Sequence, residues 1–251
     1  MSTHYETLQH ADTYREAFAV EPPAALGERH LWPRKPGFFI VHAATATPPV
    51  STAGAAEEAA PTTASDTPSD AASTRVLVPA QWGLVPHWVK SASDAKLRAP
   101  KLVNAKSDLA STGTAFRDAW LNSQRCIVPM VAFYEDDLRS GKAVPTRVAR
   151  VDGKPMGVAG LWARWQGAGG EVIISYCLLT VNANNHALLH RYGQPGSEKS
   201  MPAILNEGAY DAWLTARPDK AKEFMRQYAA QSLLANPVEK KADKVPKGFL
   251  D

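Results

Sequence analysis

The chain has 251 residues, 45% of them hydrophobic and 21% charged, with a formal net charge of +3. This composition supports a sizeable hydrophobic core and excludes global disorder. A net charge this small does not by itself indicate a nucleic-acid partner. No apolar run approaches the length of a membrane span, and the N-terminus lacks the basic and apolar regions of a signal peptide. We therefore expect a cytoplasmic protein with no membrane partner, in which Cys126 and Cys177 are buried, reduced thiols.

The first part of the chain predicts one helix and one hairpin. Residues 12–20 predict a helix with Asp12 as its N-cap, and residues 37–42 predict a strand. Residues 44–74 are nearly all Ala, Thr, Ser and Pro, with four acids and no Lys or Arg. Because this segment has no periodicity and strand-like sequence resumes at residue 75, it predicts a disordered insertion at the tip of the hairpin.

Aromatic and basic residues lie next to each other in the following segment. Residues 81–88 (QWGLVPHW) place Gly83 and Pro86 between two tryptophans, which favours a shaped loop. Basic residues follow at Lys90, Lys96, Arg98, Lys101 and Lys106. Aromatic stacking of bases and basic contacts to phosphates are typical of single-strand binding. The alternative is a pair of core tryptophans beside a solvated basic loop.

The stretch RCIVPMVAFYE, residues 125–135, predicts a strand buried on both faces. Pro129 predicts a bulge or an edge position within it. Glu135 ends the apolar run, and a carboxylate at the mouth of an apolar wall is suited to acid–base chemistry. The alternative is a solvated first residue of a loop, because Asp136 and Asp137 follow.

The remaining elements indicate an α+β or mainly β domain. Residues 115–121 predict a short helix, and residues 144–151, 157–165 and 172–182 predict strands. Residues 207–214 and 220–234 predict terminal helices, and the tail from Pro237 is basic. No nucleotide-binding, serine-hydrolase or metalloprotease motif is present, and no histidine has metal-ligand spacing with a second ligand. We therefore expect no metal and no cofactor.

Six motifs occur together in a specific order: WGLVPHW (82–88), NAKSD (104–108), RCIVPMVAFYE (125–135), GVAGLW (157–162), LLTVNAN (178–184) and MPAIL (201–205). In this the chain resembles the SOS response-associated peptidase family, whose members process abasic sites in DNA by crosslinking to them. The resemblance covers residues 5–214 apart from the insertion. It implies one α+β domain, residues 1–236, around a distorted β-barrel with flanking helices, interrupted at 44–74 and followed by a basic tail, 237–251.

The resemblance also implies a site. The family binds single-stranded DNA in a basic groove and links its N-terminal residue to the aldehyde of an abasic site, with self-processing peptidase activity. Asn104 and Glu135 fall on the family's catalytic Asn and Glu, and Thr180 falls beside the reacting sugar. Lys106 stands where the family usually has a phosphate-binding Arg, which keeps the charge but loses bidentate geometry. The DNA contacts expected here are Trp82, Trp88, Lys90, Arg98, Lys101, Lys106 and Thr180.

The sequence departs from the family pattern at its reacting groups. Ser2 stands in place of the catalytic cysteine, and Gly193 stands in place of the catalytic histidine. Asp136 replaces a Trp that commonly follows the Glu. His190 is a nearby histidine that we include, with Ser2, Asn104 and Glu135, in the predicted catalytic set. A free Ser2 amine can form a Schiff base, but its hydroxyl closes a much less stable ring than a thiol does.

Three hypotheses follow from these departures. In the first, a monomer of this chain binds single-stranded DNA with abasic sites, associates with the nucleoid when bound, and keeps reversible imine chemistry in a DNA-damage response. In the second, the chain is a catalytically inactive protein that binds single-stranded DNA. In the third, the chain is a true peptidase, for which the sequence offers no visible pair of nucleophile and base.

Overall fold

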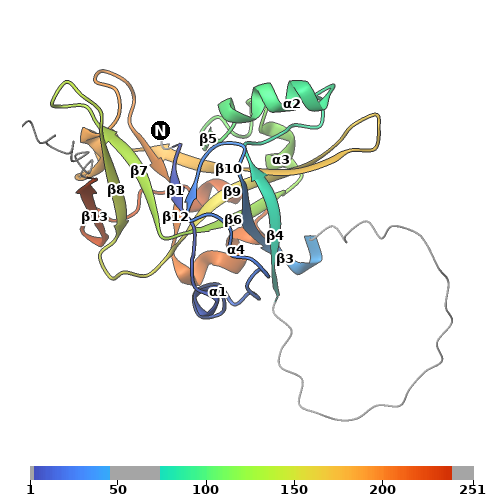
Figure 1. The fold of residues 1–251 in the computed structure, drawn as a ribbon, viewed down its shortest axis with the longest axis horizontal. Helices are drawn as coiled ribbons and strands as arrows, with labels where there is room; N and C mark the ends of the chain where they lie inside the picture. The colour runs from blue at the N-terminus through green and yellow to red at the C-terminus, as the bar shows by residue number, and fades with distance from the viewer. Residues whose placement is uncertain (1–2, 46–73, 239–251) are drawn as a thin grey trace, which may run out of the picture.

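The computed structural model describes residues 3–45 and 74–238. Five of its strands close into a barrel: β3 (Pro36–His42), β4 (Arg75–Trp82), β6 (Arg125–Met130), β9 (Met156–Gln166) and β10 (Val172–Asn182). Around this ring β10 pairs with β4 in parallel, and every other pair of neighbours is antiparallel. The predicted α+β domain around a β-barrel is therefore confirmed (Figure 1).

The barrel is filled because β6, β9 and β10 are mostly apolar and are buried on both faces. All six residues of β6 are buried, as are the first eight residues of β9. In β10 the run from Ser175 to Val181 is buried as well. Continuous apolar runs of this kind are expected for strands that are covered on both sides. Three of the six sequence motifs, those in residues 125–135, 157–162 and 178–184, thus supply strands of the barrel.

A second, five-stranded sheet lies beside the barrel, on the left in Figure 1. It consists of β13 (Leu233–Pro237), β8 (Val144–Arg150), β7 (Ala132–Asp137), β1 (Tyr5–Glu6) and β2 (His30–Leu31), in that order and all antiparallel. The N-terminal residues therefore lie next to β7. This pairing brings the start of the chain to the strand that carries Glu135.

The strand predicted for residues 125–135 is divided between the two sheets, as β6 and β7. Pro129 stays inside β6 opposite Gly157 of β9, and the interruption falls at Val131. The Val131 N–H donates to the Glu6 carbonyl oxygen at 2.9 Å, so the break is fixed by β1. Because the chain changes sheets at Val131, Glu135 lies inside β7 and not after the end of a strand.

Three short strands extend the barrel sheet. β5 (Asn104–Lys106) runs parallel to β10, and β11 (Ser200–Pro202) pairs with the end of β10 in the antiparallel sense. β12 (Ile204–Leu205) pairs with β9. β5 lies in the motif NAKSD, and β11 and β12 lie in the motif MPAIL. These two motifs therefore also belong to the barrel sheet.

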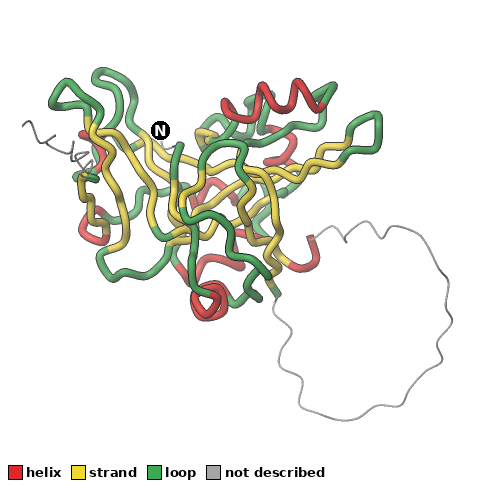
Figure 2. Tube along the Cα trace, viewed as in Figure 1, coloured by secondary structure: helices red, strands yellow, loops and turns green. Residues whose placement is uncertain are grey.

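The helices are short and lie around the strands (Figure 2). The α-helices are α1 (Ala11–Phe18), α2 (Ala92–Arg98), α3 (Arg117–Leu121) and α4 (Tyr210–Leu214). The 3-10 helices are η1 (Ala43–Thr45), η2 (Ala99–Lys101), η3 (Leu189–Arg191), η4 (Glu207–Ala209), η5 (Ala221–Phe224) and η6 (Ala230–Ser232). None of the helices in the described part of the chain has the length and apolar character needed to cross a membrane.

Two sequence predictions about helices were wrong. The N-cap of α1 is His10, without a side-chain cap bond, and not Asp12, which lies in the first turn. Residues 220–234 form η5, η6 and the start of β13 in place of one helix. This segment is held by tertiary contacts, since the Tyr228 carbonyl oxygen accepts from Nε2 of buried His186 at 2.8 Å. Such contacts override a favourable helix propensity.

The predicted hairpin is present, because β3 and β4 pair in register from Pro36 opposite Gln81 to His42 opposite Arg75. Of the predicted insertion, Ala44 and Thr45 belong to η1, and residues 46–73 lie outside the described residues. Residues 239–251 of the predicted tail also lie outside them. The predicted domain boundaries stay predictions.

Candidate active site

A pocket of about 400 Å³ opens where β1, β2 and β7 meet the loop that follows η3. Its walls include Thr3, His4, Trp32, Glu135, Gly193 and Gln194. These residues come from four separate segments of the chain, which the pairing of β1 with β2 and β7 brings together. We call it the Glu135 pocket.

Glu135 is only 7% exposed and lines this pocket from within β7. The alternative that it is a solvated loop residue is therefore wrong. Its register partner is Thr146 of β8, which is also buried. A carboxylate in such a wall is held in place by two strands, as acid–base chemistry requires.

His4 is a residue of the pocket that the sequence did not indicate. Its ring is stacked between the rings of Trp32 and Tyr134, with both centroid distances 4.0 Å and both interplanar angles 10°. Its Nε2 lies 3.0 Å from Nδ1 of His30. Burial, followed by the neighbouring His30, lowers the pKa of His4 to about 4, so its imidazole is neutral at pH 7.

Glu6 fixes the strands behind this stack. Its buried carboxylate accepts from Nε of Arg147 at 2.7 Å and from the Tyr134 hydroxyl, and Arg29 lies 3.4 Å away. Burial alone would raise the pKa of Glu6, but the bonds from Arg147 and Tyr134 outweigh it and hold the pKa at about 2. Glu6 is therefore an ionised anchor between β1, β7 and β8.

Gly193, which the family resemblance places at the catalytic histidine, lines the Glu135 pocket. Its φ is +74°, and a Cβ added there would meet no atom within 4 Å. Its N–H donates to the Asp136 carbonyl oxygen at 2.8 Å. The pocket therefore has room for a larger side chain at this residue, in a backbone conformation that favours glycine.

His190 lies in a neighbouring pocket that shares Leu138 and Gly193 with the first. This second pocket, of about 590 Å³, is also lined by Arg139, Arg191 and Lys199, and we call it the basic pocket. Nδ1 of His190 donates to the His186 carbonyl oxygen at 2.8 Å. His190 is not among the residues that line the Glu135 pocket, and its catalytic role stays a prediction. The sequence did not indicate that Arg139 joins Arg191 and Lys199 here, because Arg139 is far from the other two along the chain.

Asn104, Lys106 and Thr180 lie together on the paired strands β5 and β10. Lys106 is opposite Thr180 in the register, and its ammonium forms an ion pair with Glu198. Thr180 is buried and its hydroxyl contacts the Ala105 carbonyl oxygen at 3.4 Å, so its side chain is directed into the fold. The joint action of Asn104 and Glu135 stays a prediction, as does the position of Ser2, which lies outside the described residues.

The two tryptophans of WGLVPHW have different environments. Trp82 is completely buried and donates to the Val103 carbonyl oxygen at 3.1 Å, so the prediction that it contacts DNA is wrong. Trp88 is half-buried, and the guanidinium of Arg98 lies 5.1 Å from its ring centroid. Arg98 also forms an ion pair with Asp94 at 2.7 Å. Lys90, Arg98 and Lys101 are all exposed. The loop thus presents one tryptophan and several cations at the surface.

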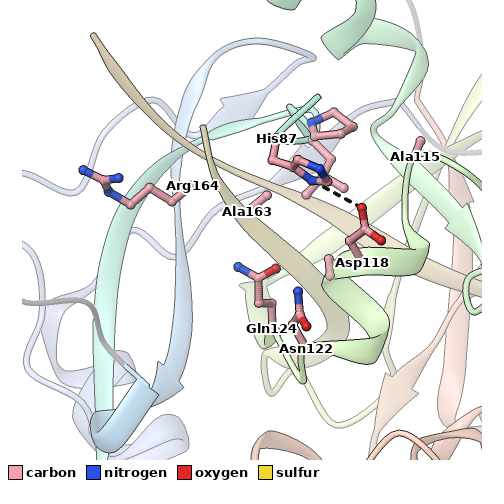
Figure 3. Close-up of a pocket in the computed structure, with 10 residues that line it drawn as sticks. His87, Ala115, Asp118, Asn122, Gln124, Ala163 and Arg164 are labelled. Atoms are coloured by element: carbon pink, nitrogen blue, oxygen red, sulfur yellow. Dashed lines mark ion pairs between the residues drawn. The ribbon is translucent and has the colours of Figure 1, made fainter. Parts of the chain in front are cut away.

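His87 of the same loop faces a third pocket, of about 200 Å³ (Figure 3). Its Nδ1 lies 3.2 Å from a carboxylate oxygen of Asp118 on α3. Asn122 and Gln124 line the same pocket and are drawn below this pair in Figure 3. None of these residues lines the Glu135 pocket.

Both cysteines are inert packing residues. Cys126 and Cys177 are fully buried, and burial raises the pKa of both thiols, that of Cys177 to about 12. Neither thiol is therefore a nucleophile at neutral pH. Among residues 3–45 and 74–238 there is no cluster of three or more His, Cys, Asp or Glu side chains that could hold a metal ion.

A sequence model of the SOS response associated peptidase (SRAP) family matches residues 2–245. The chain belongs to the SRAP family. The match includes both flanks of the hairpin insertion and all the elements around the Glu135 pocket. The family resemblance that the six motifs predicted is therefore confirmed.

Relatives of this SRAP chain include named proteins and solved structures. It is 28% identical to abasic site processing protein YoqW of Bacillus subtilis over 63% of this chain and 67% of that one. It is also 28% identical to abasic site processing protein HMCES of Gallus gallus, over 66% of this chain but 53% of that one. The chain thus spans about half the length of this vertebrate relative. A crystal structure of a Bordetella bronchiseptica protein has 37% identity and a TM-score of 0.77, covering 95% and 100% of the two chains.

Proposed function

We propose that this SRAP chain binds single-stranded DNA at an abasic site and forms a reversible imine between the Ser2 amine and the sugar aldehyde. The observation that carries the proposal is that Thr3, which follows Ser2 directly in the chain, lines the same pocket as the buried Glu135. The names of the relatives YoqW and HMCES, abasic site processing proteins, support the substrate class.

The chemistry needs few groups. An α-amine has a pKa of about 7.7–8.0, so a useful fraction is neutral and nucleophilic at pH 7. Its nitrogen attacks the aldehyde carbon, and the resulting carbinolamine loses water to give the imine. Water reverses this reaction, and the serine hydroxyl does not trap the imine in a stable ring. A short-lived crosslink is the expected product.

The basic pocket supports binding of the strand beside the reacting sugar. It adjoins the Glu135 pocket at Leu138 and Gly193, and it carries the side chains of Arg139, Arg191 and Lys199. Phosphates on one side of the abasic site would contact these cations. The exposed Lys90 and Lys101, with half-buried Trp88, offer a second contact region for the strand.

A second candidate function is binding without chemistry. It is favoured by Gly193, because the pocket has an open glycine where the family has a proton-transferring histidine. A peptidase function is less well supported, since Cys126 and Cys177 are buried with raised thiol pKa values. The two DNA-binding functions differ only in whether an imine forms.

The test is trapping of the imine with borohydride. Protein whose Met1 removal has been verified by mass spectrometry is mixed with single-stranded DNA that contains one abasic site, with and without reductant. We expect a covalent band only with reductant, and none after acetylation of the N-terminal amine. A Ser2→Cys variant is expected to give a band without reductant. If the wild type binds this DNA but gives no band with reductant, the function is binding alone.

A further inference from the structure

Two histidines form a path from the Glu135 pocket to the solvent. His4 lines the pocket and is partly buried, whereas His30 on the neighbouring strand β2 is exposed. Nε2 of His4 and Nδ1 of His30 are 3.0 Å apart, within hydrogen-bonding distance. β1 and β2 fix this contact, since Glu6 lies opposite His30 in the register and the Thr7 N–H donates to the Arg29 carbonyl oxygen.

A hydrogen bond between two neutral imidazoles has two possible proton arrangements. In one, Nε2–H of His4 donates to His30, so Nδ1 of His4 is an acceptor and Nε2 of His30 carries a proton. In the other, Nδ1–H of His30 donates to His4, so Nδ1 of His4 carries the proton and Nε2 of His30 is an acceptor. Conversion of the first into the second takes up a proton at His4 and releases one at His30.

We propose that His4 and His30 act as a proton relay that exchanges protons between the Glu135 pocket and the solvent during imine formation. This inference rests on the proposed function. Reaction of the N-terminal ammonium with the aldehyde gives an iminium ion and one water. Two protons leave the nitrogen and two reach the oxygen that departs as water, so no net proton is gained or lost. The relay carries protons out when the amine is freed and back when the hydroxyl leaves.

The surroundings of His4 suit this role. Its ring is held in one plane by Trp32 and Tyr134, and the contact between its Nε2 and Nδ1 of His30 sets which edge of the ring faces His30. Among the described residues, the titratable groups around it include His30, Glu6, Tyr134 and Glu135. Burial and His30 lower the pKa of His4 to about 4, and Glu6 opposes them. A neutral imidazole accepts at one nitrogen and donates at the other, as a relay requires.

The test compares trapping rates in matched variants. His4→Phe keeps an aromatic ring between Trp32 and Tyr134 but removes both nitrogens. His30→Gln keeps a hydrogen-bonding partner for His4 that cannot pass a proton on. We expect both variants to form the borohydride-trapped imine about 10- to 100-fold more slowly, while the affinity for the abasic strand stays within about twofold. His10→Phe, on the exposed start of α1, is the control and is expected to keep the wild-type rate.

A further measurement separates a relay from a structural role. His30→Ala opens a site at the surface, and imidazole added to the solution is expected to restore its trapping rate without changing its affinity for DNA. Wild-type rates in both His4→Phe and His30→Gln would overturn the relay and leave the imine chemistry intact. If neither the wild type nor Ser2→Cys can be trapped, the proposed function fails and the relay fails with it.

Discussion

Glu6 is a buried carboxylate that connects strands next to the Glu135 pocket. It is 2% exposed, yet three side chains from three segments contact it: Arg29, Tyr134 and Arg147. Tyr134 in turn stacks on His4. Removing this carboxylate leaves Arg147 without its buried partner and frees Tyr134, so the change affects both stability and the pocket.

We predict that Glu6→Gln destabilises the protein by about 2 kcal/mol at pH 7, because the amide loses the negative charge and replaces one accepting oxygen with an NH2 group that cannot accept from Arg147. The pKa of Glu6 is about 2 in the folded protein, below the ordinary 4.5. The stabilisation is therefore complete above the unfolded pKa and is lost as the pH falls toward the folded pKa. Denaturant unfolding at a series of pH values is expected to show the gap between wild type and variant closing in acid.

Glu21→Gln is the control for this measurement, since Glu21 is exposed and its ion pair among the described residues is with Arg15 at the surface. A gap between wild type and Glu6→Gln that stays constant from neutral to acid pH would contradict the assignment of Glu6 as the titrating group.

At the residue scale the sequence indicated Glu135 but not His4. Glu135 ends a long apolar run, which is a local signal. His4 has no such signal, because its partners Trp32 and Tyr134 are distant in sequence and meet it only through strand pairing. Trp82 was misassigned for the opposite reason, since a tryptophan beside basic residues has the same local pattern in a core and at an interface.

At the element scale, strands that are buried on both faces were predictable, and short elements fixed by tertiary contacts were not. β9 and β10 follow their apolar runs closely. α2 has no apolar periodicity and depends on Ser91, whose side chain accepts from the Asp94 N–H as an N-cap. Residues 220–234 predicted one helix, but the last two of them, Leu233 and Leu234, pair with β8 as the start of β13.

A narrow barrel of five strands needs small residues where neighbouring strands approach, and Gly160 of β9 is such a residue. A Cβ at this position would lie 2.6 Å from the Cys177 carbonyl oxygen of β10 and 2.9 Å from the Cys126 sulfur of β6. We predict that Gly160→Ala destabilises the protein by about 1–3 kcal/mol, because backbone on the next strand must move. Thermal and denaturant unfolding measure this change.

Gly208→Ala is the matched control, since a Cβ there would meet no atom within 4 Å. It is expected to change the free energy of unfolding by less than about 0.5 kcal/mol. Equal free energies of unfolding for the two alanine variants would contradict the prediction. They would show that the neighbouring strands can move to accept a Cβ at Gly160 without loss of stability.

At the scale of the whole molecule, the site lies where the two sheets meet, and its charge is local. The net charge of +3 did not indicate a DNA-binding face. The basic pocket nevertheless gathers Arg139, Arg191 and Lys199 next to the Glu135 pocket. Some cations are already partly neutralised, as Lys106 is by Glu198 and Arg139 is by Asp137. Arg191 and Lys199 form no ion pair among the described residues, and their side chains donate only to backbone carbonyl oxygens there, so their charges are the ones left for phosphate.

We therefore predict that the double variant Arg191→Gln, Lys199→Gln binds single-stranded DNA more weakly and with a weaker dependence on salt. On a single strand, each phosphate that a cation neutralises adds about 0.7 to the steepness of log affinity against log salt, so removing both cations is expected to reduce that steepness by about 1.4. Fluorescence anisotropy titrations at several salt concentrations measure this slope. The control, Arg217→Gln with Lys222→Gln, removes the same charge from residues that line neither pocket. Equal slopes for the two double variants would mean that only the overall charge matters and that the strand does not pass over the basic pocket.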